Sequence, residues 1–262
     1  MELDIKNLDQ LKAIGAAEES NQAYDIIPLP SKGLFYPNKK STIKVAYLTA
    51  ADENILLSPN LAQSGKMLDV LLERKVLDKD INIKNLLNGD RDAILVFLRT
   101  SGYGSIYPVK LKDPKTGQDF EYDVDLNEIK YKEISAPDEN GEYLVKLPNS
   151  QSIIKFRMLT IGELDEIDAI EEKKKKLHKN YIDETLTRRL ERLIMEIDGD
   201  RDKGRIYHFI NKMKIGDSSF IRRAYTRFEP GIDLSLEVEA PSGEFFRTTV
   251  PILINFFYPD IE

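Results

Sequence analysis

The apolar and polar positions of this chain change period several times, and each change predicts a separate element. In residues 1–23 apolar residues recur every three positions among mostly acidic ones, which is typical of an amphipathic helix. So short a helix is marginal in isolation, and we therefore expect an N-terminal arm that docks on another surface. The apolar residues that would make this contact are Ile5, Leu8, Leu11 and Ile14.

Prolines and short apolar runs organise the first half of the chain beyond this arm. The stretch 26–37 is punctuated by prolines and one glycine, which predicts an extended, turn-rich loop. A strand is expected over 43–48. Thr49 follows it and is interpreted as a helix N-cap, because acidic residues occupy the next turn. The other elements expected here are helices over 66–77 and 91–101 and a hairpin formed by 105–111 and 118–124.

Two amphipathic patterns in the second half predict a pair of long antiparallel helices. The first begins at Thr160, where Glu163 completes a capping box. Within 171–176 two glutamates precede lysines by four residues, which is the favourable orientation on a helix, so we interpret this tract as a solvated face. The residues expected to face inward are Ile161, Leu164, Ile167 and Ile170 in the first helix, and Leu186, Leu190, Leu193 and Ile197 in the second.

Short motifs of the first half return in the second half in the same order. Leu29-Pro30-Ser31 is echoed by Leu147-Pro148-Asn149. Gly89-Asp90, which precedes a helix, a glycine and a hairpin, is echoed by Gly216-Asp217. A further copy at Gly199-Asp200 leaves the register of that region open. The constant order of the motifs predicts an internal duplication.

The predicted fold is therefore α+β, a tandem duplication of a strand–helices–β-hairpin unit preceded by the amphipathic arm. We place the arm at 1–25 and the first repeat, with its strand, helices and hairpin, at 26–135. The second repeat would occupy 136–262 and contain a strand, the long helical pair, a hairpin and an aromatic carboxyl end.

Composition excludes several classes of protein. The 262 residues carry 45 acidic and 38 basic side chains, a net charge of −7, with no cysteine and two histidines. Disulfide scaffolds, zinc ribbons, iron–sulfur clusters and thiol nucleophiles are thereby excluded. The longest apolar run, 93–98, is far shorter than the roughly 20 residues of a membrane span, and the amino terminus is too acidic for a secretory signal. We expect a cytosolic origin and no membrane partner.

No constellation of side chains predicts catalysis, and neither a cofactor nor a metal is expected. His208 lies in an apolar context that favours a buried histidine over a catalytic one. The aspartates within 198–202 alternate as in a calcium loop, but Lys203 and Phe209 stand where that loop needs glycine and glutamate, so a polar turn is favoured. Nothing assembles a nucleophile, a base and an orienting partner, which disfavours an enzyme.

The strongest charge feature is a basic stretch over 201–228. It holds eight basic and two acidic residues and interleaves them with aromatic rings, a composition that suits nucleic acid. In an acidic protein, however, a single basic patch more often meets an acidic protein surface. We expect a protein partner, with nucleic acid and a purely structural role as the alternatives. The residues predicted to make the contact are Arg222, Arg223 and Arg227.

Three motifs of the first half carry a resemblance in combination. Residues 29–37 (LPSKGLFYP), 48–56 (LTAADENIL) and 87–92 (LNGDRD) are followed by a Tyr-Gly pair, a hairpin and the sequence DVDL at 123–126. Together they resemble the baseplate hub and hub-assembly proteins of T-even-like contractile-tailed bacteriophages. The resemblance covers mainly 26–130 and reaches the second half only through the repeat.

The hairpin turn departs from the pattern of that family. Many relatives carry a cysteine pair there, around a proline and a glycine, which suggests a small metal knuckle. Asp113 and Thr116 stand at those places in this chain and are poor zinc ligands. We therefore carry over no metal, and we expect turn geometry and packing to hold the hairpin.

The resemblance implies a non-enzymatic phage tail protein, either a structural subunit of the central baseplate hub or a factor needed to assemble it. It would be made in the host cytoplasm and act in the virion through other tail and baseplate proteins, without a small-molecule substrate. We expect the arm to dock on a neighbouring subunit and 201–228 to meet an acidic tail protein. The alternatives are an assembly chaperone absent from the virion and a nucleic-acid-binding scaffold. An aromatic carboxyl end suits either a contact surface or the core, and consists of Phe256, Phe257 and Tyr258.

Overall fold

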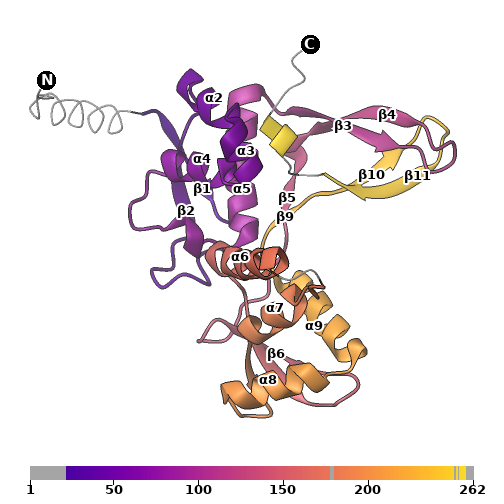
Figure 1. Ribbon diagram of the computed structural model, residues 1–262. Coiled ribbons are helices and arrows are strands. Elements are labelled where there is room, and N and C mark those ends of the chain that lie inside the picture. The colour runs from indigo at the N-terminus through magenta and orange to yellow at the C-terminus, as the bar shows by residue number, and fades with distance from the viewer. Residues whose placement is uncertain (1–21, 178–179, 251, 253, 258–262) are drawn as a thin grey trace, which may run out of the picture.

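The chain forms two lobes and a pair of β-hairpins that projects from the first of them (Figure 1). The computed structural model describes residues 22–177, 180–250, 252 and 254–257. Helices and small antiparallel sheets are mixed throughout this part, in line with the expected α+β class. Within the described residues, no helix is both long enough and apolar enough to cross a membrane.

The first lobe packs helices against a two-stranded antiparallel sheet. Thr49 caps the first described helix as predicted, because its backbone N–H and its hydroxyl donate to Asp52 at 2.7 and 2.8 Å. Lys75, which is fully buried, reaches the same carboxylate, with Nζ 2.5 Å from Oδ2. The elements are β1 (Tyr24–Pro28), β2 (Thr42–Ala46), α2 (Ala50–Leu56), α3 (Pro59–Ser64), α4 (Met67–Lys75), η1 (Ile83–Asn85) and α5 (Asn88–Tyr103).

The second lobe has a three-stranded antiparallel sheet and four helices among the described residues. Its longest helix begins with the predicted capping box. The N–H of Thr160 donates to Glu163 Oε2 at 3.1 Å, and the N–H of Glu163 donates back to the Thr160 hydroxyl at 3.3 Å. The elements are β6 (Glu142–Lys146), β7 (Ile153–Arg157), α6 (Ile161–Leu177), α7 (Thr185–Leu193), β8 (Ile194–Ile197), α8 (Lys203–Lys212) and α9 (Ile215–Phe228).

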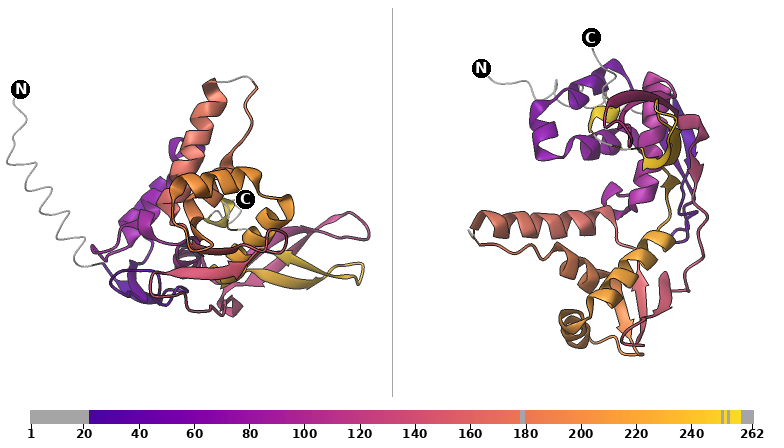
Figure 2. Two further views of the ribbon diagram at one scale, coloured as in Figure 1. Left: turned by 90° about the horizontal axis from the view of Figure 1, so that it is seen from below. Right: turned by 90° about the vertical axis from the view of Figure 1, so that its right-hand side faces the viewer.

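Two hairpins from distant parts of the chain lie side by side and extend away from the lobes (Figures 1 and 2). The first turns around 113–117, between the two strands that the sequence predicts, and the second turns around 241–243, in the repeat for which a hairpin is expected. Phe120 of one hairpin meets Phe246 of the other edge-on, with 6.4 Å between ring centroids. The strands are β3 (Ile106–Lys112), β4 (Asp119–Asp125), β10 (Ser235–Glu239) and β11 (Phe245–Thr249), joined at the base by β5 (Lys130–Tyr131) and β9 (Ile232–Asp233), with short turns η2 (Leu126–Glu128) and η3 (Ile254–Phe257).

Two apolar clusters fill the lobes, and they interlock where α5 and α6 begin. Leu87, which precedes α5, packs in the cluster of the second lobe, whereas Ile161 at the start of α6 packs in that of the first. The contact is close at Gly89, where a Cβ would lie 2.0 Å from the carbonyl oxygen of Pro230. Only glycine permits this approach, so the two lobes are held against each other by backbone packing.

A buried aspartate at the start of a helix holds a strand-connecting loop in each lobe. Asp90 of α5 accepts hydrogen bonds from the backbone N–H of Ser31, at 2.8 Å, and from the hydroxyl of Tyr36. Asp217 of α9 accepts the backbone N–H groups of Asn149 and Ser150 at 2.8 and 3.0 Å. The same contact thus recurs at motifs that the sequence matched. The duplication itself stays a prediction.

The structure corrects three expectations about individual segments. Residues 26–28, expected as the start of the loop 26–37, belong to strand β1, because β1 pairs with β2 from Tyr24 opposite Ala46 onward. The helix after 185 ends at Leu193, and Ile197 belongs to strand β8, which takes the unoccupied edge of β7. His208 lies exposed on α8 rather than buried.

Candidate interaction surfaces

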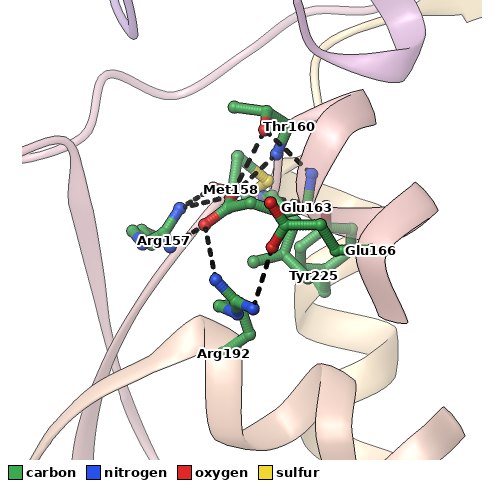
Figure 3. Close-up of polar contacts among 8 residues, drawn as sticks. Arg157, Met158, Thr160, Glu163, Glu166, Arg192 and Tyr225 are labelled. Carbon is green, nitrogen blue, oxygen red and sulfur yellow. Dashed lines mark hydrogen bonds and ion pairs between the residues drawn. The ribbon is translucent and has the colours of Figure 1, made fainter. Parts of the chain in front are cut away.

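Carboxylates paired with arginines fix the elements that meet around α6 (Figure 3). Arg157 of β7 donates from both terminal nitrogens to the carboxylate of Glu163, at 2.8 and 2.5 Å. Arg192 of α7 lies 4.0 Å from the same carboxylate and pairs with Glu166 at 3.2 Å. The cluster therefore joins a strand and two helices of the second lobe.

The electrostatics of this cluster favour a permanent ion pair. Burial would raise the pKa of Glu163, but hydrogen bonds from Arg157 and Thr160 outweigh burial and hold that pKa below its ordinary value. The bond to Glu163 raises the pKa of Arg157 in turn. Burial raises the pKa of the neighbouring Tyr225 to about 12, and its hydroxyl accepts the N–H of Leu159 at 3.2 Å. These groups keep one protonation state near neutral pH, which suits a structural contact rather than proton transfer.

The basic stretch 201–228 divides into a paired and an exposed part. Arg201 binds the buried carboxylate of Glu142 through two hydrogen bonds of 3.0 and 2.7 Å. Arg205 pairs with Asp200 at 2.5 Å. Because these two arginines are paired within the protein, the candidate binding surface is limited to α9. There an open hollow of about 390 Å³ is lined by arginines that lack an ion-pair partner among the described residues: Arg222, Arg223 and Arg227.

A larger groove of about 750 Å³ lies between α6, α7, α9 and the start of α5. Leu186, expected to face inward, is 43% exposed beside it. Arg189 and Arg222 line the groove, as do two acidic residues, Asp183 and Glu229. Its apolar lining consists of Leu159, Leu164, Leu186, Leu190, Leu193 and the ring of Tyr225. The sequence signal for this surface was the apolar stripe of the two helices, which was interpreted as core alone.

The remaining predicted contact residues lie in the core or outside the described part of the chain. Phe256 and Phe257 are buried in the first lobe, where their rings meet edge-on with centroids 5.4 Å apart. Tyr107 packs against Phe256 with centroids 4.9 Å apart. Core packing, the alternative left open by the sequence, therefore accounts for these two rings. The residues outside the described part are Ile5, Leu8, Leu11, Ile14 and Tyr258.

Each carboxylate of the alternating acidic turn has a protein partner. Asp198 accepts the N–H of Ile153 at 2.8 Å, Asp200 pairs with Arg205, and Asp202 caps α8 by accepting the N–H of Arg205 at 2.8 Å. In the part of the chain that the structure describes, no three histidine, aspartate or glutamate side chains gather as a metal site would need. The three carboxylates of this turn are thus engaged in contacts within the protein.

The tips of the two hairpins are joined by Asp113, which the sequence marked only as a poor metal ligand. Its Oδ1 accepts the N–H groups of Lys115 and Thr116, at 2.8 and 3.1 Å, within its own turn. The hydroxyl and N–H of Ser242 donate to the two oxygens at 2.9 and 3.1 Å. Burial would raise the pKa of Asp113, but these bonds hold it below its ordinary value. An aspartate before a turn proline was a visible signal, whereas its partner 129 residues away was not.

Comparison with protein families identifies the family of this chain. A family model described as T4 bacteriophage base plate protein matches residues 30–242, from the loop after β1 to the tip of the second hairpin. Searches among curated proteins and among solved structures found no match.

Proposed function

The chain belongs to the T4 bacteriophage base plate protein family, and from this premise we propose that it is a structural protein of a phage tail baseplate. The observation that carries the proposal is the extent of the match, which runs from the loop after β1 through both lobes and the first hairpin and ends at the turn between β10 and β11. The match confirms the resemblance found in the first half of the sequence and extends it through the second lobe.

Within the baseplate, the proposed place is the central hub, as a subunit or as a factor required to build it. Two interlocked lobes and a projecting pair of hairpins supply several separate surfaces for neighbours (Figure 2). The buried carboxylates are taken up by ion pairs and hydrogen bonds that join elements of the fold. We therefore assign the function to protein–protein interfaces rather than to chemistry on a substrate.

Two of these interfaces follow from charge. The exposed arginines of α9 would meet an acidic tail protein, and the acidic arm at residues 1–23 would dock on a neighbouring subunit. The recurring aspartate contacts of Asp90 and Asp217 support an origin of the two lobes by duplication, with units at 26–135 and 136–262. In such a protein the two halves keep one framework while their surfaces take different partners.

The experiment that tests the proposal is quantitative mass spectrometry of purified, DNA-filled phage particles, with a known tail protein as the internal standard. A fixed copy number per particle is expected. Absence from particles, with abundance in the infected-cell lysate, would overturn a structural role and support the assembly chaperone instead.

Charge reversal separates the α9 interface from general effects of charge. Arg222→Glu with Arg223→Glu should lower incorporation into tails, whereas Lys212→Glu with Lys214→Glu changes the charge equally on exposed residues outside the hollow and should not. Equal incorporation of both variants would contradict the assignment. If nucleic acid is the partner, affinity of the purified protein for DNA will fall steeply with salt and only the α9 variant will lose it.

A further inference from the structure

We propose that the groove between α6, α7 and α9 binds the acidic segment 1–21 of a second copy of this chain. The inference rests on the proposed function, in which the arm docks on a neighbour and the α9 arginines meet an acidic partner. It makes these two contacts one interface, with the chain itself as the partner.

The groove has the chemistry that an acidic amphipathic helix requires. Its leucine floor includes Leu186, whose side chain is 43% exposed and so has apolar surface left to bury. Arg222 lines both the groove and the adjoining hollow, so the apolar floor runs directly into the cluster of α9 arginines. On the other side Arg189 pairs with Asp168 at 3.2 Å through Nη2, and its buried Nε has no hydrogen-bond partner in the described structure. Apolar surface beside such arginines is the arrangement by which grooves hold amphipathic helices.

The segment 1–21 matches this surface in length, apolar pattern and charge. Its apolar residues span 5–14, which is about 14 Å of helix at 1.5 Å per residue. The segment carries five acidic and two basic side chains. The groove and the hollow together present three arginines without an ion pair among the described residues, besides Arg189, and two carboxylates, Asp183 and Glu229. Opposite net charges therefore face each other, and the two lysines of the segment have carboxylates available at the groove.

The position of β1 favours the groove of another molecule. In Figures 1 and 2 the start of β1 lies on the opposite side of the first lobe from α7 and α9. The segment 1–21 joins the described chain on that side, so the groove of a neighbouring copy is accessible to it. The contact joins different surfaces of the two copies, so it builds a ring or an open chain when it runs in one direction and a closed dimer when two copies exchange their segments.

Complementary variants of the full protein test this directly. A chain lacking residues 1–21 keeps the groove but has no segment, while Arg189→Glu with Arg222→Glu keeps the segment but reverses the groove charge. We expect the unaltered chain to associate as its concentration rises and each variant alone to stay monomeric. An equimolar mixture of the two variants should form a one-to-one dimer and nothing larger. Sedimentation velocity measures all three results.

Two controls guard against misfolding and against general charge effects. Lys212→Glu with Lys214→Glu should leave association within about twofold, because both lysines lie outside the groove. Leu8→Asp with Leu11→Asp alters only the segment and should weaken association more than about tenfold, as the loss of a buried apolar contact does.

The results that overturn the inference are distinct from those that overturn the proposed function. A full-length chain that stays monomeric at all concentrations, or a variant mixture that forms no dimer, removes the second-copy contact. A third outcome also overturns the proposal: the full-length chain is monomeric, and a labelled 1–21 peptide binds only to the chain that lacks residues 1–21. In that case the groove is filled by the segment of the same molecule. Each outcome leaves the baseplate role intact, because that role is judged by the copy number in particles.

Discussion

Asp90→Ala should destabilise the protein more than Asp217→Ala, although both remove a buried carboxylate from the first turn of a helix. Asp90 is fully buried, and it accepts the N–H of Ser31, which is also fully buried, and the hydroxyl of Tyr36. Alanine leaves both donors without an acceptor, and the N–H of Ser31 is out of reach of water. Each such donor costs about 1–3 kcal/mol.

Removal of the buried Asp90 charge offsets part of this loss in the free energy of unfolding. Burial raises the pKa of Asp90 even though Ser31 and Tyr36 bind the carboxylate, so the folded state tolerates the charge poorly. We therefore expect a net loss of about 2–4 kcal/mol for Asp90→Ala. The partners of Asp217 are the backbone N–H groups of Asn149 and Ser150 and the side-chain amide of Asn149; both residues are exposed, so we expect water to satisfy these donors after the substitution. The expected loss for Asp217→Ala is about 1–2 kcal/mol.

Urea unfolding followed by far-ultraviolet circular dichroism measures both losses, with Asp123→Ala as a control at an exposed strand position. Hydrogen exchange read by mass spectrometry assigns each loss to a lobe, which is needed because two apolar clusters need not unfold together. Equal losses for the two aspartate variants, or an Asp90→Ala protein as stable as the control, would refute the argument from buried donors.

Three further predictions concern the contact of Asp113 with Ser242 between the hairpin tips (the hairpin clasp), the contact between the lobes at Gly89, and the effect of acid on stability. Asp113→Ala should speed hydrogen exchange in both hairpin turns while leaving the lobes unchanged, and slow exchange at either tip would argue against the clasp. Gly89→Ala should lower the melting temperature by several degrees, because its Cβ would lie 2.0 Å from a backbone oxygen. Gly216→Ala should lower it little, because its Cβ would lie 2.3 Å from a side-chain nitrogen of Asn149, which is able to rotate away. Thermal melts that rank the two variants in the other order contradict this reasoning. The pKa of Glu163 is lower in the folded than in the unfolded chain, so the stability that its ionised form contributes is present above the unfolded pKa and is lost as pH falls through the folded pKa. Glu163→Gln should therefore reduce the change of the urea midpoint between about pH 5 and pH 3, which unfolding curves recorded across this range check.

Several elements were predictable because their determinants lie within a few residues of each other. Thr49 and Thr160 each precede an acidic residue by three positions, and each begins a helix with the expected reciprocal contacts. The turn at 113–117 joins two strands of alternating pattern at the predicted positions. Local hydrogen bonds and local periodicity are written in the sequence directly, so these elements and their order required no tertiary information.

Segments whose state depends on a distant partner were predicted incorrectly. The apolar stripe through 186–197 continues at a helical spacing, yet Ile194–Ile197 is a strand because β7 offers an edge to pair with. The stretch 26–37 was predicted as a loop because of its prolines, yet its first residues, 26–28, pair with β2. In each case the hydrogen bonds of a neighbouring strand outweighed the local preference.

The sequence by itself determined the family, the types and order of most elements, and the presence of a basic stretch in an acidic chain. Only the tertiary structure decided which of those charges are available. Arg201 lies in the basic stretch but is bound by Glu142, 59 residues earlier, whereas Arg222 remains exposed beside a leucine-lined groove. Phe256 likewise became core because Tyr107 lies against it. Pairing and burial depend on residues far apart in the chain that meet only on folding, so no local pattern specifies them.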